Sequence, residues 1–471
     1  MNPTKLSIDQ KRGLLADLRQ RKAQQPEKYP LAFTQEEVWL LQWLLKEPSL
    51  FIIPVVFRLT GLVNTDALVG ALRETVRRQG ALRTHFEAWD WEIVQSVDPA
   101  LKLEVEIVDL CMQDKAVRDA EARRIATQTA AAPFDLAKAP LARFKLIRIS
   151  EFEYFLVTVF HRIVVDGWSL GVFFYELGHH YAAFSTGKPA PLPELAIQYG
   201  DYTLWLRRRM QAEVLQEHLA YWKNQLHAAP MALELPRDLP GAEPSFCGAR
   251  LHFKLAADDV SAFQKICQME GATLYMGLLA AFVALLHCWT GSPDIVLAAV
   301  ASTNRDRKET EGLIGLFGTL LLVRSRTGRA STFRNLLRQV RAYMLGAYAH
   351  QDVPLLQLFM ELGSGLSAGN MPYRTLFSFQ RTSSPSFTML GLNLELVKLD
   401  VNVTSCELGM FIHPDWGGPD LMVAFEYMTH LFAEETIKRL IRRYRNIIET
   451  ASGYPDIRLD MAAVDPGEDP E

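Results

Sequence analysis

Two periodicities of hydrophobic residues run along the chain and predict both strands and helices. Runs rich in β-branched and aromatic residues favour strands at 51–59, 143–149 and 154–160, and the apolar positions between residues 65 and 79 recur at helical spacing. The same reasoning predicts helices at 115–131, 167–184, 199–222, 272–288, 331–348 and 434–451, and strands at 83–86, 91–97, 249–255, 294–300, 375–379 and 421–427. Pro54 indicates an edge strand or the start of a strand, because proline cannot donate to a sheet ladder.

These elements come in two similar passes, and 471 residues exceed the length at which one hydrophobic core stops growing. An α/β or mixed α+β chain of two related lobes is therefore expected. The Pro-rich stretch 188–194 is the best candidate for the crossing between the lobes. We expect an N-terminal helical extension at 1–28, an N-terminal lobe at 29–187, a C-terminal lobe at 188–463 and a flexible tail at 464–471. The extension either lies on the main body or docks a partner protein.

Composition and charge argue against several classes of protein. Lys and Arg number 50 against 54 Asp and Glu, without a long basic block, which argues against a nucleic-acid binder. The five cysteines never form a Cys-x-x-Cys pair, and His179 and His180 lack further ligands at metal-binding spacing, so we expect a reducing cytoplasm and no metal. The longest apolar stretch, 274–286, is too short to span a bilayer and predicts a buried core helix. No signal core precedes it, so a cytoplasmic protein without a membrane segment is expected.

The most informative segment lies at residues 159–169. A strand-like apolar run ends abruptly in His161 and Arg162, and three apolar residues separate this pair from Asp166 and Gly167. Polar residues at the end of a buried strand, followed by an Asp-Gly turn, place a side chain at the mouth of a cleft.

This segment resembles the His-His-x-x-x-Asp-Gly signature of the condensation-domain superfamily, the carrier-protein-dependent acyltransferases of nonribosomal peptide synthesis. Arg162 stands where the signature has its second His, the one that the family uses in chemistry. Further motifs of the family are matched, in the family's order, at residues 30–39, 77–86, 199–205 with 221–222, 314–324 and 350–354. Gln79 and Gly80 replace a His-Glu pair of the second motif, and Thr319 replaces an Asn. The resemblance covers nearly the whole chain, from about residue 28 to about residue 460.

The resemblance implies two chloramphenicol-acetyltransferase-like lobes arranged as a V-shaped pseudodimer, with a central tunnel that admits donor and acceptor. Each substrate would be tethered by the phosphopantetheine arm of an acyl or peptidyl carrier protein, and no cofactor would bind the chain directly. The chain contains no adenylation motif and no obvious carrier-domain serine motif. We therefore expect it to work in trans or to have been cut from a larger assembly line.

Arg162 changes the chemistry that the resemblance implies. In relatives the second His is placed to take a proton from the attacking amine or to orient it. A guanidinium stays protonated and has no acceptor, so Arg162 cannot serve as a base, although it can donate hydrogen bonds to an oxyanion or bind a carboxylate. His161 is either the rescuer or a hydrogen-bonded core histidine, since neighbours in an extended segment point to opposite faces.

The rest of the signature carries expectations about shape as well as chemistry. Asp166 is expected to shape the turn and to pair with an arginine, for which Arg305 is the candidate, and direct catalysis by Asp166 is the alternative. Gly167 is expected to allow the backbone turn. Trp168 and Ser169 are expected to begin the next helix. The candidate catalytic residues are thus His161, Arg162, Asp166 and Gly167, and the candidate tunnel or structural residues are Trp168, Ser169, Arg305 and Thr319.

Two functions remain open at this point. The first is a condensation-type acyltransferase of nonribosomal peptide or hybrid polyketide biosynthesis, joining a carrier-bound thioester to an amine or alcohol with altered catalytic chemistry. The second is a catalytically inactive condensation-like domain that recruits a tailoring enzyme or a carrier protein. Condensation-like domains of glycopeptide assembly lines carry His-Arg-x-x-x-Asp-Asp and bind tailoring oxygenases; Arg162 matches this pattern, whereas Gly167 departs from it. An excised domain with an engineered His-to-Arg change is a third possibility.

Overall fold

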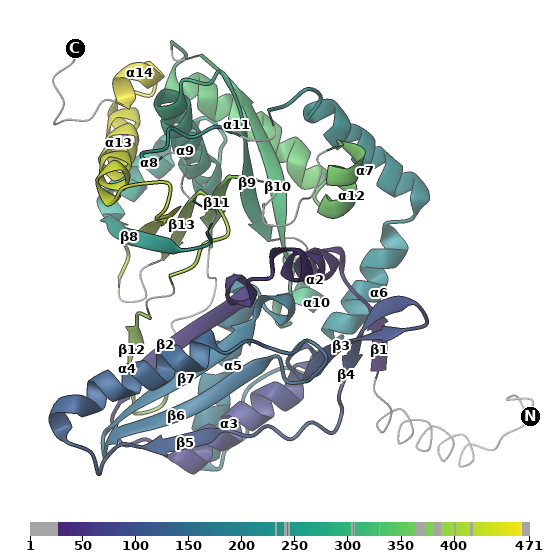
Figure 1. The fold of residues 1–471 in the computed structure, drawn as a ribbon, viewed down its shortest axis with the longest axis vertical. Coiled ribbons are helices and arrows are strands. Elements are labelled where there is room, and N and C mark those ends of the chain that lie inside the picture. The colour runs from purple at the N-terminus through teal and green to yellow at the C-terminus, as the bar shows by residue number, and fades with distance from the viewer. Residues whose placement is uncertain are drawn as a thin grey trace, which may run out of the picture.

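The chain folds into two lobes, each with a sheet and covering helices, which lie one above the other in Figure 1. The computed structural model describes residues 27–230, 233–239, 243, 245–302, 305, 307–328, 330–363, 373–380, 388–399, 402–414 and 418–463. The extension expected at 1–28, apart from its last two residues, and the tail expected at 464–471 lie outside the described residues. The mixed α/β class predicted from the hydrophobic pattern is confirmed.

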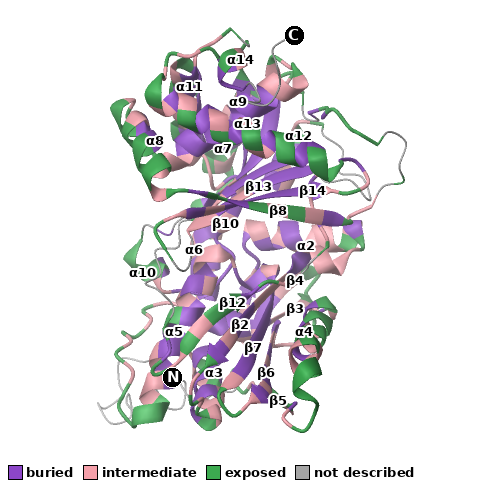
Figure 2. Ribbon diagram, turned by 90° about the vertical axis from the view of Figure 1, so that its left-hand side faces the viewer, coloured by how far each residue is buried: buried purple, intermediate pink, exposed green. Residues whose placement is uncertain are grey.

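The lower lobe is built on a five-stranded sheet with the order β12-β2-β7-β6-β5. β7 lies at its centre, and every residue of β7 after Glu153 is buried. Helices α3 and α5 cover one face of the sheet and α4 covers the other (Figure 2). The helix expected over 65–79 is α3, which buries the apolar positions that predicted it. The bounds are β2 Ile52–Thr60, β5 Glu106–Asp109, β6 Ala142–Ser150, β7 Glu153–His161, β12 Asn393–Val397, α3 Thr65–Arg78, α4 Lys115–Ala131 and α5 Gly167–Thr186.

One strand of the lower sheet comes from the C-terminal half of the chain. β12 pairs antiparallel with β2, from Asn393 opposite Thr60 to Val397 opposite Val56. β2 is therefore an inner strand over residues 56–60, and of the two alternatives for Pro54 the start of a strand is confirmed. Pro54 is tolerated because it lies near the start of β2, beyond the last residue that β12 reaches. The boundary expected near residue 188 stays a prediction.

The upper lobe contains a six-stranded sheet with the order β10-β9-β11-β13-β14-β8. Its central helix is α9, in which every residue from Met276 to His287 is buried, so the predicted core helix is confirmed. Among the described residues no single helix is long and apolar enough to cross a membrane, although α8 and α9 pass that test as a pair bent by 99°. The bounds are β8 Gly248–Leu255, β9 Asp294–Ser302, β10 Gly318–Arg326, β11 Thr375–Phe379, β13 Leu408–Pro414, β14 Leu421–Met428, α8 Ala257–Met269, α9 Leu274–Thr290, α11 Phe333–Ala349 and α13 Glu434–Gly453.

Two helices, rather than the single helix expected at 199–222, connect the lobes after the Pro-rich stretch. α6 (Tyr199–Arg209) packs into the core of the lower lobe, and α7 (Ala212–Gln225) packs into that of the upper lobe. Met210 adopts a non-helical backbone conformation between them and is itself buried in the lower core. The break redirects the chain, because one straight helix cannot bury apolar faces in both cores.

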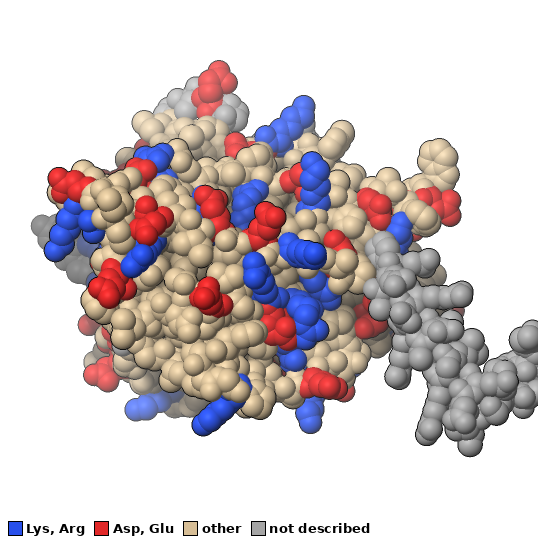
Figure 3. Space-filling view, turned by 90° about the horizontal axis from the view of Figure 1, so that it is seen from below, with Lys and Arg blue, Asp and Glu red and all other residues tan. Residues whose placement is uncertain are grey.

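The remaining elements lie around the junction of the lobes or on the surface. On the face seen in Figure 3, charged side chains of both signs are interspersed among uncharged ones. The hairpin expected from 83–86 and 91–97 is present and is extended by a third strand. The bounds are β1 Glu27–Pro30, β3 Thr84–Trp89, β4 Glu92–Val97, α2 Phe33–Leu45, η2 Pro48–Phe51, η3 Gly80–Arg83, η4 Arg162–Val164, α10 Lys308–Glu311, α12 Leu355–Glu361 and α14 Leu459–Ala462.

Candidate functional site at the junction of the lobes

The signature segment forms a strand, a short 3-10 turn and a helix in direct succession. β7 ends at His161, η4 begins at Arg162, and α5 begins at Gly167 with Asp166 as its N-cap. Helix α2 packs across η4, where the amide of Gln35 donates to the carbonyl oxygen of Ile163 at 3.2 Å. The signature therefore lies where the central strand of the lower lobe ends against an overlying helix.

His161 is a fully engaged core residue with only 1% of its surface exposed. Its Nδ1 accepts from the backbone N–H of Ile163 at 3.2 Å, so Nε2 carries the hydrogen and donates to Oε1 of Gln42 at 2.8 Å. The rings of Phe51 and Phe134 enclose the imidazole. Burial, together with the positive charge of Arg143, lowers the pKa of His161 to about 3. The geometry agrees with the interpretation as a core histidine and leaves no ring nitrogen for substrate.

This setting predicts an acid-sensitive fold. Because the pKa of His161 lies near 3 in the folded chain and near 6.5 when unfolded, the unfolded chain binds the extra proton as the pH falls below 6.5. We expect the free energy of unfolding to drop by about 2 kcal/mol more in wild type than in His161→Gln between pH 7.5 and pH 5, since one pKa unit corresponds to about 1.4 kcal/mol. Urea midpoints at both pH values measure the difference. Parallel losses in the two proteins would contradict it.

Arg162 is half-buried between the lobes. Among the described residues no hydrogen bond or ion pair is formed by its guanidinium. Its charge nevertheless acts on two acidic side chains from other elements, Glu37 of α2 and Tyr373, just before β11. Burial raises the pKa of each, and the nearby positive charge of Arg162 opposes that rise. Arg162 is thus a cation without a close counter-ion among the described residues, and its charge acts on groups from both lobes.

Asp166 has a saturated carboxylate. Oδ1 accepts from the N–H of Ser169 at 2.8 Å and from Nη2 of Arg305 at 3.1 Å. Oδ2 accepts from the N–H groups of Phe317 and Gly318 at 3.0 and 3.1 Å. The predicted pairing with Arg305 is confirmed. Four donors, three of them backbone, occupy both oxygens, so the geometry supports a structural role rather than proton transfer.

Asp166 and its neighbours fasten a segment of the upper lobe to the lower one. We call residues 310–318, from the end of α10 to the first residue of β10, the strap. Arg305 donates through Nη1 to the carbonyl oxygens of Thr310 and Leu313, and its guanidinium lies 3.8 Å from the centre of the Phe317 ring. Ser169 is fully buried and exchanges two hydrogen bonds with the backbone of Gly315, at 2.7 and 3.1 Å. Four strap residues thus contribute to the lower core: Leu313, Ile314, Leu316 and Phe317.

Gln79, which replaces a residue of the family motif, also binds the strap. Its Nε2 donates to the carbonyl oxygen of Gly312 and to Glu176, each at 3.0 Å, while its Oε1 accepts from the N–H of Ile314 at 3.0 Å. An amide can donate and accept at once, which suits a site that presents one carbonyl and one N–H. The replacement is visible in the sequence, and this departure from the family motif is the signal by which the role of Gln79 could have been found.

Gly167 does not adopt a left-handed backbone conformation, and it lies against a side chain of the upper lobe. It is not among the glycines with positive φ, so the expected explanation by a backbone turn is wrong. A Cβ at this position would lie 2.6 Å from Cδ and Oε1 of Gln380, which follows β11 in the upper lobe, so the exposed end of that side chain would have to move aside. Trp168 and Ser169 begin α5 as expected, and Nε1 of Trp168 donates to the carbonyl oxygen of Glu311. The start of α5 is therefore in close contact with both lobes.

Glu37 is a buried acid that sequence reasoning missed. Its Oε1 accepts from the N–H of Leu355 at 2.9 Å, which connects α2 to the start of α12 in the upper lobe. It lines a cavity of about 20 Å³, roughly the room for one water, together with Thr319 and Phe317. Burial raises the pKa of Glu37 to about 8. No local pattern marks this residue, because its neighbours come from four separate segments.

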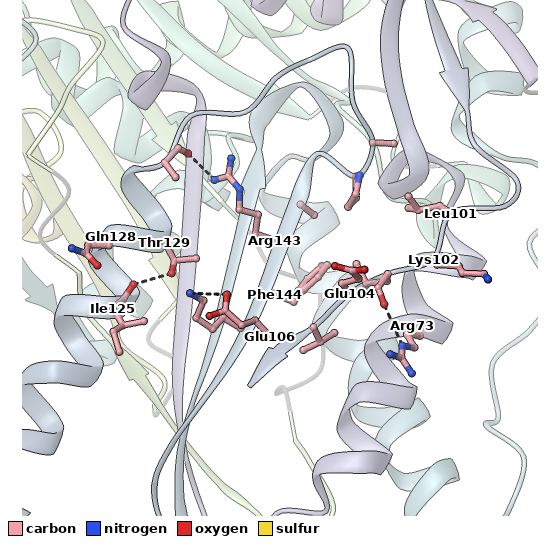
Figure 4. A pocket seen from close by; sticks show the side chains of 17 residues that line it. Arg73, Leu101, Lys102, Glu104, Glu106, Ile125, Gln128, Thr129, Arg143 and Phe144 are labelled. Atoms are coloured by element: carbon pink, nitrogen blue, oxygen red, sulfur yellow. Dashed lines mark hydrogen bonds and ion pairs between the residues drawn. The ribbon is translucent and has the colours of Figure 1, made fainter. Parts of the chain in front are cut away.

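A much larger cavity of about 1020 Å³ lies within the lower lobe, between α4 and the β5–β6 edge (Figure 4). Its polar lining includes Arg73, which donates to the carbonyl oxygen of Leu103, and Lys145, which pairs with Glu106 at 3.0 Å. None of the signature residues lines it. Among the described residues no group of three or more His, Cys, Asp or Glu is placed to hold a metal ion.

Comparisons with known proteins agree on one family. The family model described as "Condensation domain" matches residues 25–467. One of the linear gramicidin synthase proteins of Brevibacillus parabrevis is 37% identical over 437 residues, which cover 90% of this chain and 6% of that protein. Chondramide synthase cmdD of Chondromyces crocatus is 33% identical over 432 residues, covering 91% of this chain and 11% of that protein. The chain therefore spans only a small part of the curated relatives it matches.

Solved structures share the fold. The complex of the X-domain and OxyB from teicoplanin biosynthesis matches with a TM-score of 0.80 and 24% identity, over 94% of this chain and 97% of that chain. The condensation domain from the monacolin K polyketide synthase MokA matches with a TM-score of 0.81 and 21% identity, over 92% and 99%. These likenesses support the predicted chloramphenicol-acetyltransferase-like architecture.

Proposed function

Because this chain belongs to the condensation domain family, we propose that it is a carrier-dependent acyltransferase of nonribosomal peptide or hybrid polyketide biosynthesis, with altered catalytic chemistry. The donor is an acyl or peptidyl thioester and the acceptor is an amine or alcohol. Both are presented on phosphopantetheine arms of carrier proteins, and no cofactor binds the chain directly. The observation that carries this proposal is an intact signature framework, in which Asp166, Ser169 and Arg305 hold the strap while Arg162 stays free of a close ion pair among the described residues.

Arg162 then serves as a donor rather than a base. Attack on the thioester carbonyl places negative charge on its oxygen, and a guanidinium offers two parallel N–H groups to such an oxyanion. The partly buried setting strengthens that interaction relative to water. Positioning of two tethered substrates supplies much of the remaining rate, because it turns a bimolecular encounter into a reaction between fixed groups.

Recruitment of a tailoring enzyme is the second candidate. The observation that favours it is the absence of a proton acceptor within the described signature itself. His161 has both nitrogens engaged, Asp166 has both oxygens engaged, and Arg162 is a cation. The teicoplanin X-domain was solved in complex with OxyB, and that complex supports a docking role for a similar fold.

Turnover with loaded carriers separates the two functions. Wild type and Arg162→His are incubated side by side with donor and acceptor carriers that bear a panel of aminoacyl-phosphopantetheine groups. We expect condensed product from wild type, detected by mass spectrometry of the acceptor arm. Product from Arg162→His alone would show that the arginine disables chemistry and would favour recruitment. Failure of both proteins with every pair would also count against acyl transfer.

A further inference from the structure

We propose that Glu37 is the proton acceptor of the lobe junction, taking the place of the imidazole that Arg162 replaces. This proposal rests on the proposed acyl transfer and adds a second functional side chain beside Arg162. Amide formation from a protonated amine needs a base, because an ammonium has no lone pair with which to attack. Arg162 also repels an incoming ammonium, which favours attack by the neutral amine.

Three other titratable groups at the junction do not meet this need. His161 is enclosed with both nitrogens engaged, and Asp166 spends its oxygens on the strap and on Arg305. Burial raises the pKa of Tyr373, which keeps its phenol protonated. The charge of Arg162 acts on Glu37 and Tyr373, and of these two residues Glu37 carries a carboxyl group.

The carboxyl group of Glu37 is held in place through one of its two oxygens. Oε1 is fixed by the N–H of Leu355, at 2.9 Å across the lobe junction. Oε2 accepts no hydrogen bond among the described residues, and Glu37 keeps 8% of its surface exposed. The water-sized cavity that Glu37 lines with Thr319 offers a place through which a proton can leave.

The surrounding charges suit a base that works near neutral pH. Burial raises the pKa of Glu37 to about 8, the charge of Glu36 adds to the rise, and the hydrogen bond from Leu355 and the charge of Arg162 oppose it. Glu36 is itself paired with Arg207. From the upper lobe, Tyr373 and Asp352 face the same region, and Asp352 lies 3.9 Å from Arg209. A base whose pKa lies close to the working pH combines availability with proton affinity.

The proposed step balances as follows. The carboxylate of Glu37 takes one proton from the acceptor ammonium and becomes a neutral acid, while the amine gains its lone pair. The amine nitrogen bonds to the thioester carbon, and Arg162 stabilises the oxyanion. The C–S bond then breaks, the nitrogen loses a second proton, and the thiolate takes one proton to leave as a thiol. The proton that remains returns to solvent, so that one ammonium and one thioester give one amide, one thiol and one proton.

Glu37→Gln tests the inference, with Glu36→Gln on the same helix as the matched control. Glutamine keeps the acceptor for Leu355 but cannot take a proton, so the fold is expected to persist. With loaded carriers at pH 7, we expect Glu37→Gln to lower the single-turnover rate by about 100-fold or more and Glu36→Gln to change it less than threefold. Glu37→Asp, which retains a carboxylate, is expected to recover part of the rate.

A second acceptor distinguishes proton transfer from a structural role. Methoxyamine is neutral at pH 7 and needs no base to expose its lone pair, so with it the defect of Glu37→Gln is expected to shrink to less than tenfold. If Glu37→Gln slows the reaction equally with both acceptors, or with neither, Glu37 is not the base. The proposed acyl transfer would still stand in that case, provided that wild type turns over. Absence of turnover in wild type would instead overturn the proposed function, and this inference with it.

Discussion

Arg162→Gln is expected to lower kcat by about 100- to 1000-fold with little change in KM, if the chain transfers acyl groups as proposed. Removing one oxyanion donor from a preorganised site typically costs this much, because the interaction forms only as charge develops on the carbonyl oxygen. Arg162 is suited to the role because it is half-buried and lacks a close ion pair among the described residues. Single-turnover rates with loaded carriers, measured over a range of acceptor concentrations, separate the two constants.

The lysine variant is the control for charge alone. Arg162→Lys retains a cation but loses the planar pair of donors, so its rate is expected to lie between those of wild type and Arg162→Gln. A rate for Arg162→Gln equal to that of wild type would show that the guanidinium does not contact the reacting carbonyl. A large rise in KM with unchanged kcat would assign it to substrate binding instead.

Arg305→Leu is expected to destabilise the fold by about 3–5 kcal/mol, because it leaves the carboxylate of Asp166, whose side chain is only 10% exposed, without its counter-ion. The same change removes donors from the carbonyl oxygens of Thr310 and Leu313, which hold the strap. Arg305 has only 6% of its surface exposed, so water cannot readily replace these bonds. Urea or thermal unfolding monitored by circular dichroism measures the loss.

Arg326→Gln provides the matched control for this second prediction. Arg326 also pairs with an aspartate, Asp294, but 63% of its side chain is exposed. Exposed ion pairs contribute little, so the control is expected to lose less than about 1 kcal/mol. Equal losses in the two variants would show that the strap does not depend on the Asp166–Arg305 pair.

Local patterns in the sequence accounted for the elements that carry the signature. The strand expected at 154–160 is β7, and the helix expected at 167–184 is α5, because a buried strand and an N-capped helix each leave a local periodicity. The pairing of Asp166 with Arg305 was also predicted. The sequence-based predictions failed where contacts with segments distant in the sequence determine the secondary structure. β12 is a short strand of five residues, most of them exposed, and it pairs with β2 from the other half of the chain. The helix expected at 199–222 breaks at Met210 because α6 packs into one core and α7 into the other.

The sequence by itself determined the family and the position at which its chemistry departs, since both are written in contiguous motifs around His161 and Arg162. Only the tertiary structure decided which groups of that site are free to act. Asp166 is occupied by donors from Phe317 and Gly318, about 150 positions away. The charge of Arg162 acts on Glu37 because α2 packs across η4. Hydrogen bonds and burial between segments distant in the sequence determine the protonation state of each site residue and whether substrate can reach it. Local sequence patterns do not encode these contacts.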